Sequence, residues 1–157
     1  MLLKKIFYRV RLSLLMYGFA WGIWFAGFIN KDFRSRLAET PFNFRMGVKD
    51  EGPVRYFRCV NGRLRSSRKP MEPMAGEFGL MWRDSQAGGQ AMLDMLTGKP
   101  KALYDAVVAG VLLLEGDGKM VAWFLQTVTQ LNRVFRSKKK PSASKAGSDG
   151  DNKADTS

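Results

Sequence analysis

Hydrophobic and polar residues follow regular spacings along most of this chain, and these spacings predict an ordered series of helices and strands. Residues 12–29 contain no charged side chain, and this run predicts an apolar helix near the N-terminus. Residues 42–49 alternate strictly between apolar and polar side chains, which is typical of a half-buried strand. Residues 120–135 repeat apolar positions at helical spacing and predict a long amphipathic helix.

Shorter patterns between these three elements predict the rest of the fold. Asn61-Gly62 predicts a two-residue hairpin turn, because both residues accept positive φ angles. Asp84 or Ser85 is the expected N-cap of a helix. The further expected strands are 54–60, 63–67, 76–83 and 111–114, and the further expected helices are 30–39, 86–97 and 100–109.

Composition divides the chain into three parts. Residues 1–40 predict a hydrophobic and amphipathic helical segment that docks on a membrane or a partner. Residues 41–136 have the length and mixture of one folded domain. Residues 137–157 predict a disordered basic tail, because they are polar and contain no aromatic side chain that would build a core.

The apolar N-terminal helix has features of a membrane or partner helix. Gly18, Gly22 and Ala26 recur every four residues and form a ridge that another helix can approach closely. Aromatic residues are dense around this ridge, as in helices at a membrane interface. The residues expected to contact a membrane or partner are Tyr17, Gly18, Trp21, Gly22, Trp24, Phe25 and Ala26.

Three placements of this helix remain open. Its uncharged run is at the short end of the length that spans a bilayer. Basic residues flank the run on both sides, which suits a helix lying in the interface of one leaflet. Burial on its own domain or on a partner is the third placement. We expect no signal-peptide cleavage, because no small-x-small site ends the run.

Charge and missing residue types narrow the function. The chain has 26 Lys and Arg against 14 Asp and Glu, a net charge of +12, which predicts an anionic partner. It contains no histidine, so imidazole catalysis and His-ligated metals are excluded. We therefore expect no enzyme, no cofactor and no metal site. The single cysteine, Cys59, cannot form an internal disulfide and fits a reducing compartment, so the expected location is the cytoplasmic side of a membrane.

Basic residues cluster around the predicted hairpin. One interpretation is contact with anionic lipid headgroups or an acidic partner, and a solvated hairpin face explains the cluster equally well. We expect no nucleic-acid binding, because the hairpin has few aromatic residues for base stacking and no recognised binding motif. The cluster comprises Arg55, Arg58, Arg63, Arg65 and Arg68.

Three local motifs resemble the sterol-carrier-protein type-2 family. Residues 55–64 resemble its hairpin, in which an Asn/Asp-Gly turn joins two hydrophobic strands. Leu96-Thr97-Gly98 resembles its L-x-G helix end, and residues 109–117 resemble a segment that ends in Gly-Asp. The resemblance extends from about residue 42 to residue 131. The chain departs from the family in its apolar N-terminal helix and its basic sheet face.

The resemblance implies an α+β fold, in which a mostly antiparallel five-stranded sheet carries helices on one face, preceded here by the apolar helix. Members of the family bind sterols, acyl chains or phospholipids in a tunnel between sheet and helices. The resemblance thus implies a non-enzymatic protein that binds or presents a lipid or other hydrophobic ligand at a membrane surface. Its first expected partner is membrane lipid, and the second is a membrane-bound protein complex. The alternative is a non-catalytic accessory or scaffold subunit of a membrane-associated enzyme complex.

The predicted ligand lining consists of apolar side chains that face the space between sheet and helices. A filled core is the default expectation from residue types alone, and a ligand tunnel is the alternative. The expected lining residues are Phe44, Met46, Phe78, Leu80, Met92, Leu96, Val107, Leu112, Leu114, Phe124 and Val128.

Overall fold

Five strands form a single sheet in the order β3-β2-β1-β4-β5. We describe a computed structural model that covers all residues except 51, 53, 100 and 138–157. The strands β1 and β4 run parallel, and every other neighbouring pair is antiparallel. The strands are β1 (Phe42–Val48), β2 (Val54–Val60), β3 (Arg63–Ser67), β4 (Phe78–Trp82) and β5 (Leu112–Gly116).

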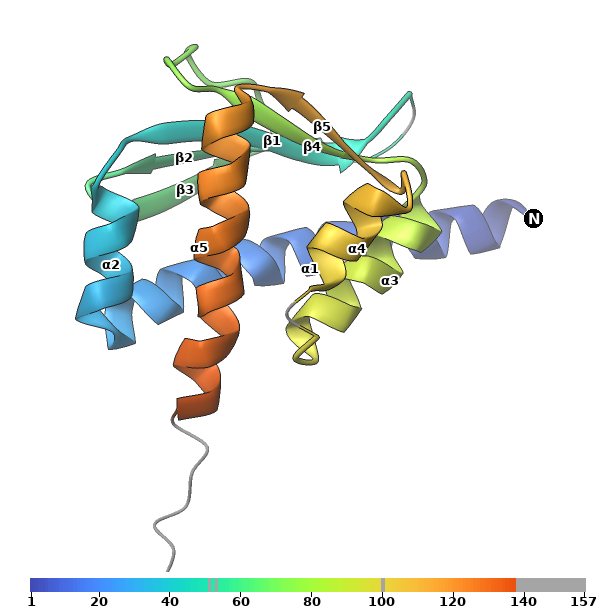
Figure 1. Cartoon of the computed structure of the whole chain (residues 1–157). Helices are drawn as coiled ribbons and strands as arrows, with labels where there is room; N and C mark the ends of the chain where they lie inside the picture. Colours follow the sequence, from blue (N-terminus) through green and yellow to red (C-terminus); the bar gives the residue numbers. More distant parts are fainter. Residues whose placement is uncertain (51, 53, 100, 138–157) are drawn as a thin grey trace, which may run out of the picture.

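The helices lie together on one face of this sheet (Figure 1). They are α1 (Leu2–Ile29), α2 (Lys31–Ala38), α3 (Ser85–Leu96), α4 (Ala102–Val108) and α5 (Gly118–Ser137). The predicted α+β fold with a mostly antiparallel five-stranded sheet is therefore confirmed. Element boundaries differ from the predicted ones by a few residues, and β5 continues to Gly116, two residues beyond its expected end.

Turns and caps form where the sequence predicts them. Asn61 and Gly62 have φ angles of 52° and 72°, and this positive-φ pair joins β2 to β3 as a tight hairpin. Asp84 caps α3, because its carboxylate Oδ1 accepts a hydrogen bond of 2.7 Å from the backbone N–H of Ala87. Asp117 likewise accepts hydrogen bonds from the first turn of α5.

The alternation along β1 places its apolar side chains in the core. Phe42, Phe44, Met46 and Val48 are all buried between the sheet and the helices. On the opposite face, the amide of Asn43 is also buried, because the loop after β3 covers it. The Asn43 side chain donates to the carbonyl of Glu72 at 2.8 Å and accepts from Nε of Arg58 at 3.0 Å, so both of its polar atoms are paired.

The first two helices belong to the same hydrophobic core as the sheet. The side chains of Leu12, Met16 and Phe19 in α1 are fully buried, and α2 adds Phe33 and Leu37. Asn30 separates the two helices with an extended backbone and caps α2. The division into functional parts at residues 1–40 and 41–136 stays a prediction, although both parts share one core. Of the predicted tail, Ser137 ends α5, and residues 138–157 lie outside the described residues.

Candidate functional site

The helix α1 carries two apolar stripes on opposite sides. The inner stripe packs against the sheet and the other helices, and each of its side chains is at most 2% exposed. The outer stripe faces away from the core, and each of its side chains is at least 50% exposed. The inner stripe is Leu12, Met16, Phe19, Ile23 and Ala26; the outer stripe is Leu3, Phe7, Val10, Leu14, Tyr17, Trp21, Trp24 and Phe28.

Both stripes arise from the same helical geometry. Successive members are three or four residues apart, which keeps each stripe on one side of a helix with 3.6 residues per turn. The helix is apolar and long enough to cross a membrane, a property that core helices and signal sequences share. The inner stripe makes α1 a core helix of this fold, and the outer stripe has no counterpart among the described residues that covers it.

The aromatic members of the outer stripe stack in pairs along the helix. The ring of Trp21 lies on Phe25 with centroids 5.3 Å apart, and Trp24 lies on Phe28 at 6.0 Å. Phe25 also stacks against Phe135 of α5 at 6.3 Å. Three of the residues predicted to contact a membrane or partner, Tyr17, Trp21 and Trp24, thus lie in the outer stripe, while Phe25 joins α1 to α5.

Basic side chains border the outer stripe. Trp24 and Phe28 share a hollow of about 710 Å³ with the basic residues Arg34, Arg63 and Arg65. The guanidinium of Arg55 lies 5.3 Å from the centroid of the Tyr17 ring, within the range of a cation–π interaction. The apolar stripe is therefore flanked by positive charge from α2, β2 and β3.

The predicted glycine ridge borders an open groove. Gly18 and Gly22 lie in a groove of about 440 Å³ between α1, α3 and α5. A Cβ atom on either glycine would contact nothing within 4 Å, so neither glycine is needed for close packing. Ala26, the third member of the ridge, is fully buried instead. The groove walls are mostly apolar and include Trp21, Met95, Leu96, Val128, Leu131 and Phe135.

Most of the predicted ligand-lining residues are packed against one another. The ring of Phe44 lies 4.7 Å from Phe124 and 5.4 Å from Phe78, measured between centroids, and Phe78 lies 5.2 Å from Phe124. No space for a ligand separates these rings. The buried members of the predicted lining are Phe44, Met46, Phe78, Leu80, Met92, Leu112, Phe124 and Val128, of which Val128 also borders the groove beside α1. Their predicted role in ligand binding stays a prediction.

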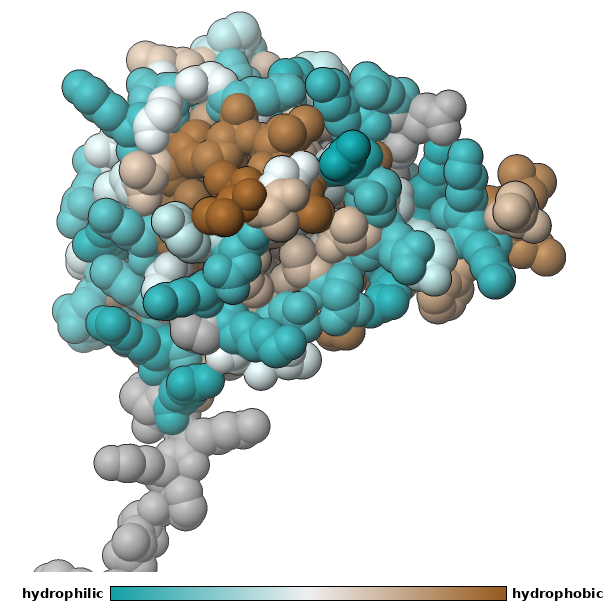
Figure 2. Space-filling model, turned by 45° about the vertical axis from the view of Figure 1, so that its right-hand side comes forward, coloured by the Kyte–Doolittle hydropathy of each residue, from teal (hydrophilic) through white to brown (hydrophobic). Residues whose placement is uncertain are grey.

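Three predicted lining residues lie outside this packed centre. Leu96 and Leu114 are 45% and 39% exposed, and Val107 is half-buried. Leu96 lies in the groove beside α1. Leu114 lies on β5, which contacts α4, and Val108 of α4 is exposed as well. Figure 2 shows an exposed apolar area on one face of the molecule. The structure therefore presents a second exposed apolar surface, separate from the outer stripe.

The predicted basic cluster divides between the two faces of the sheet. Arg58, Arg63 and Arg65 line one hollow on the face away from the helices, and Arg63 and Arg65, which lie on the edge strand β3, also reach the hollow beside Trp24 and Phe28 of α1. Arg55 lies on the helix side, because alternation along β2 places it on the same side as Phe57 and Cys59. Arg68 follows the end of β3 and is exposed.

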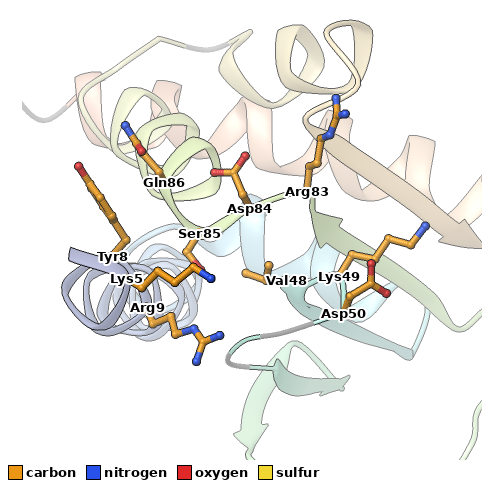
Figure 3. A pocket seen from close by; sticks show the side chains of 10 residues that line it. All are labelled: Lys5, Tyr8, Arg9, Val48, Lys49, Asp50, Arg83, Asp84, Ser85 and Gln86. Atoms are coloured by element: carbon orange, nitrogen blue, oxygen red, sulfur yellow. The ribbon is translucent and has the colours of Figure 1, made fainter. Parts of the chain in front are cut away.

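A basic cavity near the N-terminus was not predicted from the sequence. Figure 3 shows it where α1 passes the end of β1 and the start of α3. Lys5 and Arg9 of α1 line it, and they continue the spacing of the inner stripe toward the N-terminus. The sequence signal for this cavity was the change from apolar to basic side chains along the inner face of α1.

The remaining candidates for chemical activity are the thiol of Cys59 and a possible set of metal ligands. Burial raises the pKa of the Cys59 thiol to about 11, and a hydrogen bond with the backbone of Gly62 opposes this shift. Such a thiol is not a nucleophile near neutral pH. Within the described part of the chain, no three His, Cys, Asp or Glu residues gather closely enough to hold a metal ion.

Similarity to known proteins is found among solved structures. No protein-family model matches the chain, and no curated protein matches it. The fold is similar to that of a solved structure described as "UbiJ-SCP2 Ubiquinone synthesis protein", with a TM-score of 0.46 and 15% sequence identity. The alignment covers 64% of this chain and 78% of the other. Similarity at this level assigns no function, and membership of the sterol-carrier-protein type-2 family stays a prediction.

Proposed function

We propose that this chain is a non-enzymatic protein that binds lipid at a membrane surface, where the outer stripe of α1 inserts into the interface. The observation that carries the proposal is the pair of opposite stripes on α1. One stripe fixes the helix to the domain, and the other leaves eight large apolar side chains in water. A continuous exposed apolar surface of this kind marks an interaction site.

The free energy available to the outer stripe is sufficient for membrane binding. An aromatic side chain has about 150–250 Å² of surface. Burying the exposed half of one such ring at about 25 cal/mol per Å² contributes about 2 kcal/mol. Tyr17, Trp21 and Trp24 also combine an apolar ring with a polar atom, which favours the boundary between acyl chains and headgroups.

An interfacial position fits the packing of α1 better than a spanning one. A spanning helix would have to withdraw the inner stripe from the core, where Phe19 and Ile23 are buried. A helix lying in the interface buries one face about 5–10 Å deep and leaves the opposite face free. That geometry lets the inner stripe keep its contacts with the sheet.

The charge around the outer stripe favours an anionic membrane. Arg34, Arg63 and Arg65 border the stripe, so they would lie close to the headgroups when the stripe inserts. Each basic residue near an anionic surface contributes roughly 1 kcal/mol. Since anionic lipids are enriched in the cytoplasmic leaflet, we place the protein on that side.

The groove beside α1 is our candidate for the bound lipid. Its volume of about 440 Å³ falls in the range of about 300–1,000 Å³ for small-ligand sites. Trp21 belongs both to the outer stripe and to the groove wall. A lipid chain can therefore pass from the bilayer to the groove without crossing water.

Vesicle flotation tests the proposal. The full chain is mixed with phosphatidylcholine vesicles containing phosphatidylglycerol, and the fraction that floats is measured. We expect the wild type to float. The double variant Trp21→Ser/Trp24→Ser should bind at least about tenfold more weakly, because it removes two inserted rings.

The matched control removes apolar surface elsewhere. Val108→Ser changes the second exposed apolar surface and should leave flotation unchanged, since Val108 is 71% exposed and lies on α4. Urea denaturation verifies that all variants keep the wild-type midpoint. If Val108→Ser abolished flotation while the tryptophan variant bound normally, the proposed surface would be the wrong one.

A second candidate function is an accessory subunit that docks on another protein. The spacing of three and four residues along the outer stripe also suits packing against a partner helix. Native mass spectrometry of the chain purified from its own cells, after detergent removal, separates the two functions. A lipid-binding protein retains an extractable apolar molecule, whereas an accessory subunit retains a protein of fixed stoichiometry.

A further inference from the structure

The proposed function makes no use of the basic cavity shown in Figure 3. This cavity has a volume of about 490 Å³ and lies between the N-terminal part of α1, the end of β1 and the start of α3. Chain segments far apart in sequence build it. Its walls are formed by Lys5, Tyr8, Arg9, Val48, Lys49, Asp50, Arg83, Asp84, Ser85 and Gln86.

The cavity has an excess of positive charge. Four of its side chains are basic and two are acidic. The side chains of Lys5, Lys49 and Arg83 form no ion pair with another described residue. One of the two carboxylates, Asp84, already accepts the hydrogen bond that caps α3. The carboxylates of Asp50 and Asp84 therefore neutralise only part of the positive charge around the cavity.

Neutral hydrogen-bond donors accompany the charges. Ser85 lines the same cavity, and Tyr8 and Gln86 form part of its wall, although Figure 3 shows their polar ends directed away from the other lining side chains. Ser85 and Gln86 also begin α3, so the positive end of the helix dipole points toward this region. Several donors and several cations around one cavity suit an anion with many acceptor oxygens.

We propose that this cavity binds a phosphate group. Its source is either the headgroup of a membrane lipid or a soluble phosphate compound. Binding of a lipid headgroup depends on the proposed membrane function, whereas binding of a soluble phosphate compound does not. Lys5 supplies a charge from α1 and Ser85 supplies a neutral donor beside it, while Lys49 adds positive charge at the wall with its side chain directed away from Lys5 in Figure 3.

The position of the cavity relative to the outer stripe favours the soluble source. Two residues of helix correspond to a rotation of about 200°, so Phe7 and Arg9 point to opposite sides of α1. A helix is about 10 Å across, and the headgroup layer of one leaflet is about 5–8 Å thick. Inserting the outer stripe into the acyl region would therefore leave Lys5 and Arg9 at the outer edge of the headgroup layer, where they face the aqueous phase.

Binding of soluble and membrane-bound phosphate tests the proposal. The full chain is titrated calorimetrically with glycerol 3-phosphate and, separately, floated with phosphatidylcholine vesicles that contain phosphatidic acid. The key variant is Lys5→Gln, and its matched control is Lys4→Gln. The two lysines are adjacent and exposed at the start of helix α1, and only Lys5 lines the cavity. Both variants lower the net charge by the same amount.

We expect Lys5→Gln to weaken binding of glycerol 3-phosphate about tenfold, because one charge-assisted hydrogen bond is lost. Lys4→Gln should change it less than about twofold. Lys49→Gln should weaken binding less than Lys5→Gln, because the Lys49 side chain is directed away from Lys5 and Ser85 in Figure 3. Equal effects of Lys4→Gln and Lys5→Gln, or no binding of glycerol 3-phosphate, would overturn the proposal.

The flotation measurement distinguishes a lipid headgroup from a soluble phosphate compound. Flotation that depends on phosphatidic acid and is weakened more by Lys5→Gln than by Lys4→Gln identifies a lipid headgroup. Binding of glycerol 3-phosphate without flotation supports the cavity with a soluble ligand, and only the membrane function then fails. Flotation that both variants weaken equally reflects diffuse charge; it supports the membrane function and contradicts a role for this cavity in lipid binding.

Discussion

Phe19 of α1 packs edge-on against Phe124 of α5, with ring centroids 6.2 Å apart and an angle of 74° between the ring planes. Both side chains are fully buried. Phe124 also contacts Phe42, Phe44 and Phe78 of the sheet, so Phe19 extends the aromatic centre of the domain into the N-terminal helix. This contact makes α1 part of the fold.

We therefore predict opposite results for two neighbouring aromatic residues of α1. Phe19→Ala should lower the free energy of unfolding by about 3–5 kcal/mol, because it leaves a cavity in the core. Trp21→Ala should change it by less than about 1 kcal/mol, because that side chain is 58% exposed. Urea denaturation of both variants measures the difference. Similar midpoints would show that α1 does not fold as part of the core.

A second prediction concerns Gly116, where β5 ends. Its φ angle is +84°, and a Cβ atom would lie 2.4 Å from the carbonyl oxygen of Glu77. Gly116→Ala should therefore destabilise the protein by at least about 2 kcal/mol, through backbone strain and a clash with main-chain atoms. Gly118→Ala is the control, because a Cβ atom there meets nothing within 4 Å and α5 begins at this residue. Thermal unfolding should separate the two variants clearly, and equal melting temperatures would contradict the described turn.

The buried thiol predicts a pH dependence of stability. Unfolding exposes Cys59, whose pKa then falls from about 11 toward its ordinary value of 9.0. Between these values the unfolded chain loses the thiol proton and the folded chain keeps it. The unfolded state is thus favoured as pH rises, at about 1.4 kcal/mol per pH unit. The stabilisation is fully present below about pH 9 and is lost as pH rises toward 11.

Comparison with Cys59→Ala isolates this effect from other groups that titrate in the same range. From about pH 8 to about pH 10.5, urea unfolding of the wild type should lose roughly 2 kcal/mol more than that of Cys59→Ala. Iodoacetamide should modify the native thiol far more slowly than the unfolded one. Parallel pH profiles of the two proteins would contradict the burial of this residue.

The open groove predicts that Gly22 can be replaced. Gly22→Ala should stabilise the protein by about 0.5–1 kcal/mol, because alanine favours the helix and its Cβ atom contacts nothing within 4 Å. Gly22→Leu should fill part of the groove and reduce the amount of co-purified lipid, with little effect on the urea midpoint. A large destabilisation by Gly22→Ala would show that the groove is closed in solution.

Several features of the fold were predictable because their causes are local. The strand β1, the Asn61-Gly62 turn and the Asp84 cap each depend on residues close together in sequence, and all three are confirmed, although the polar face of β1 is more buried than its alternation predicts, because Asn43 is buried as well. Three residues predicted on the N-terminal helix, Tyr17, Trp21 and Trp24, lie in the exposed outer stripe. The exposed position of Leu114, in contrast, depends on which helices cover β5, and sequence spacing does not report that.

The sequence by itself determined that α1 is apolar over much of its length, because composition and helical spacing are properties of one segment. Only the tertiary structure decided which side of α1 enters the core. The inner and outer stripes have the same spacing and similar hydrophobicity, so contacts with α5 and the sheet had to distinguish them. The basic cavity arises in the same way, because Lys5, Lys49 and Arg83 converge only when three distant segments pack together.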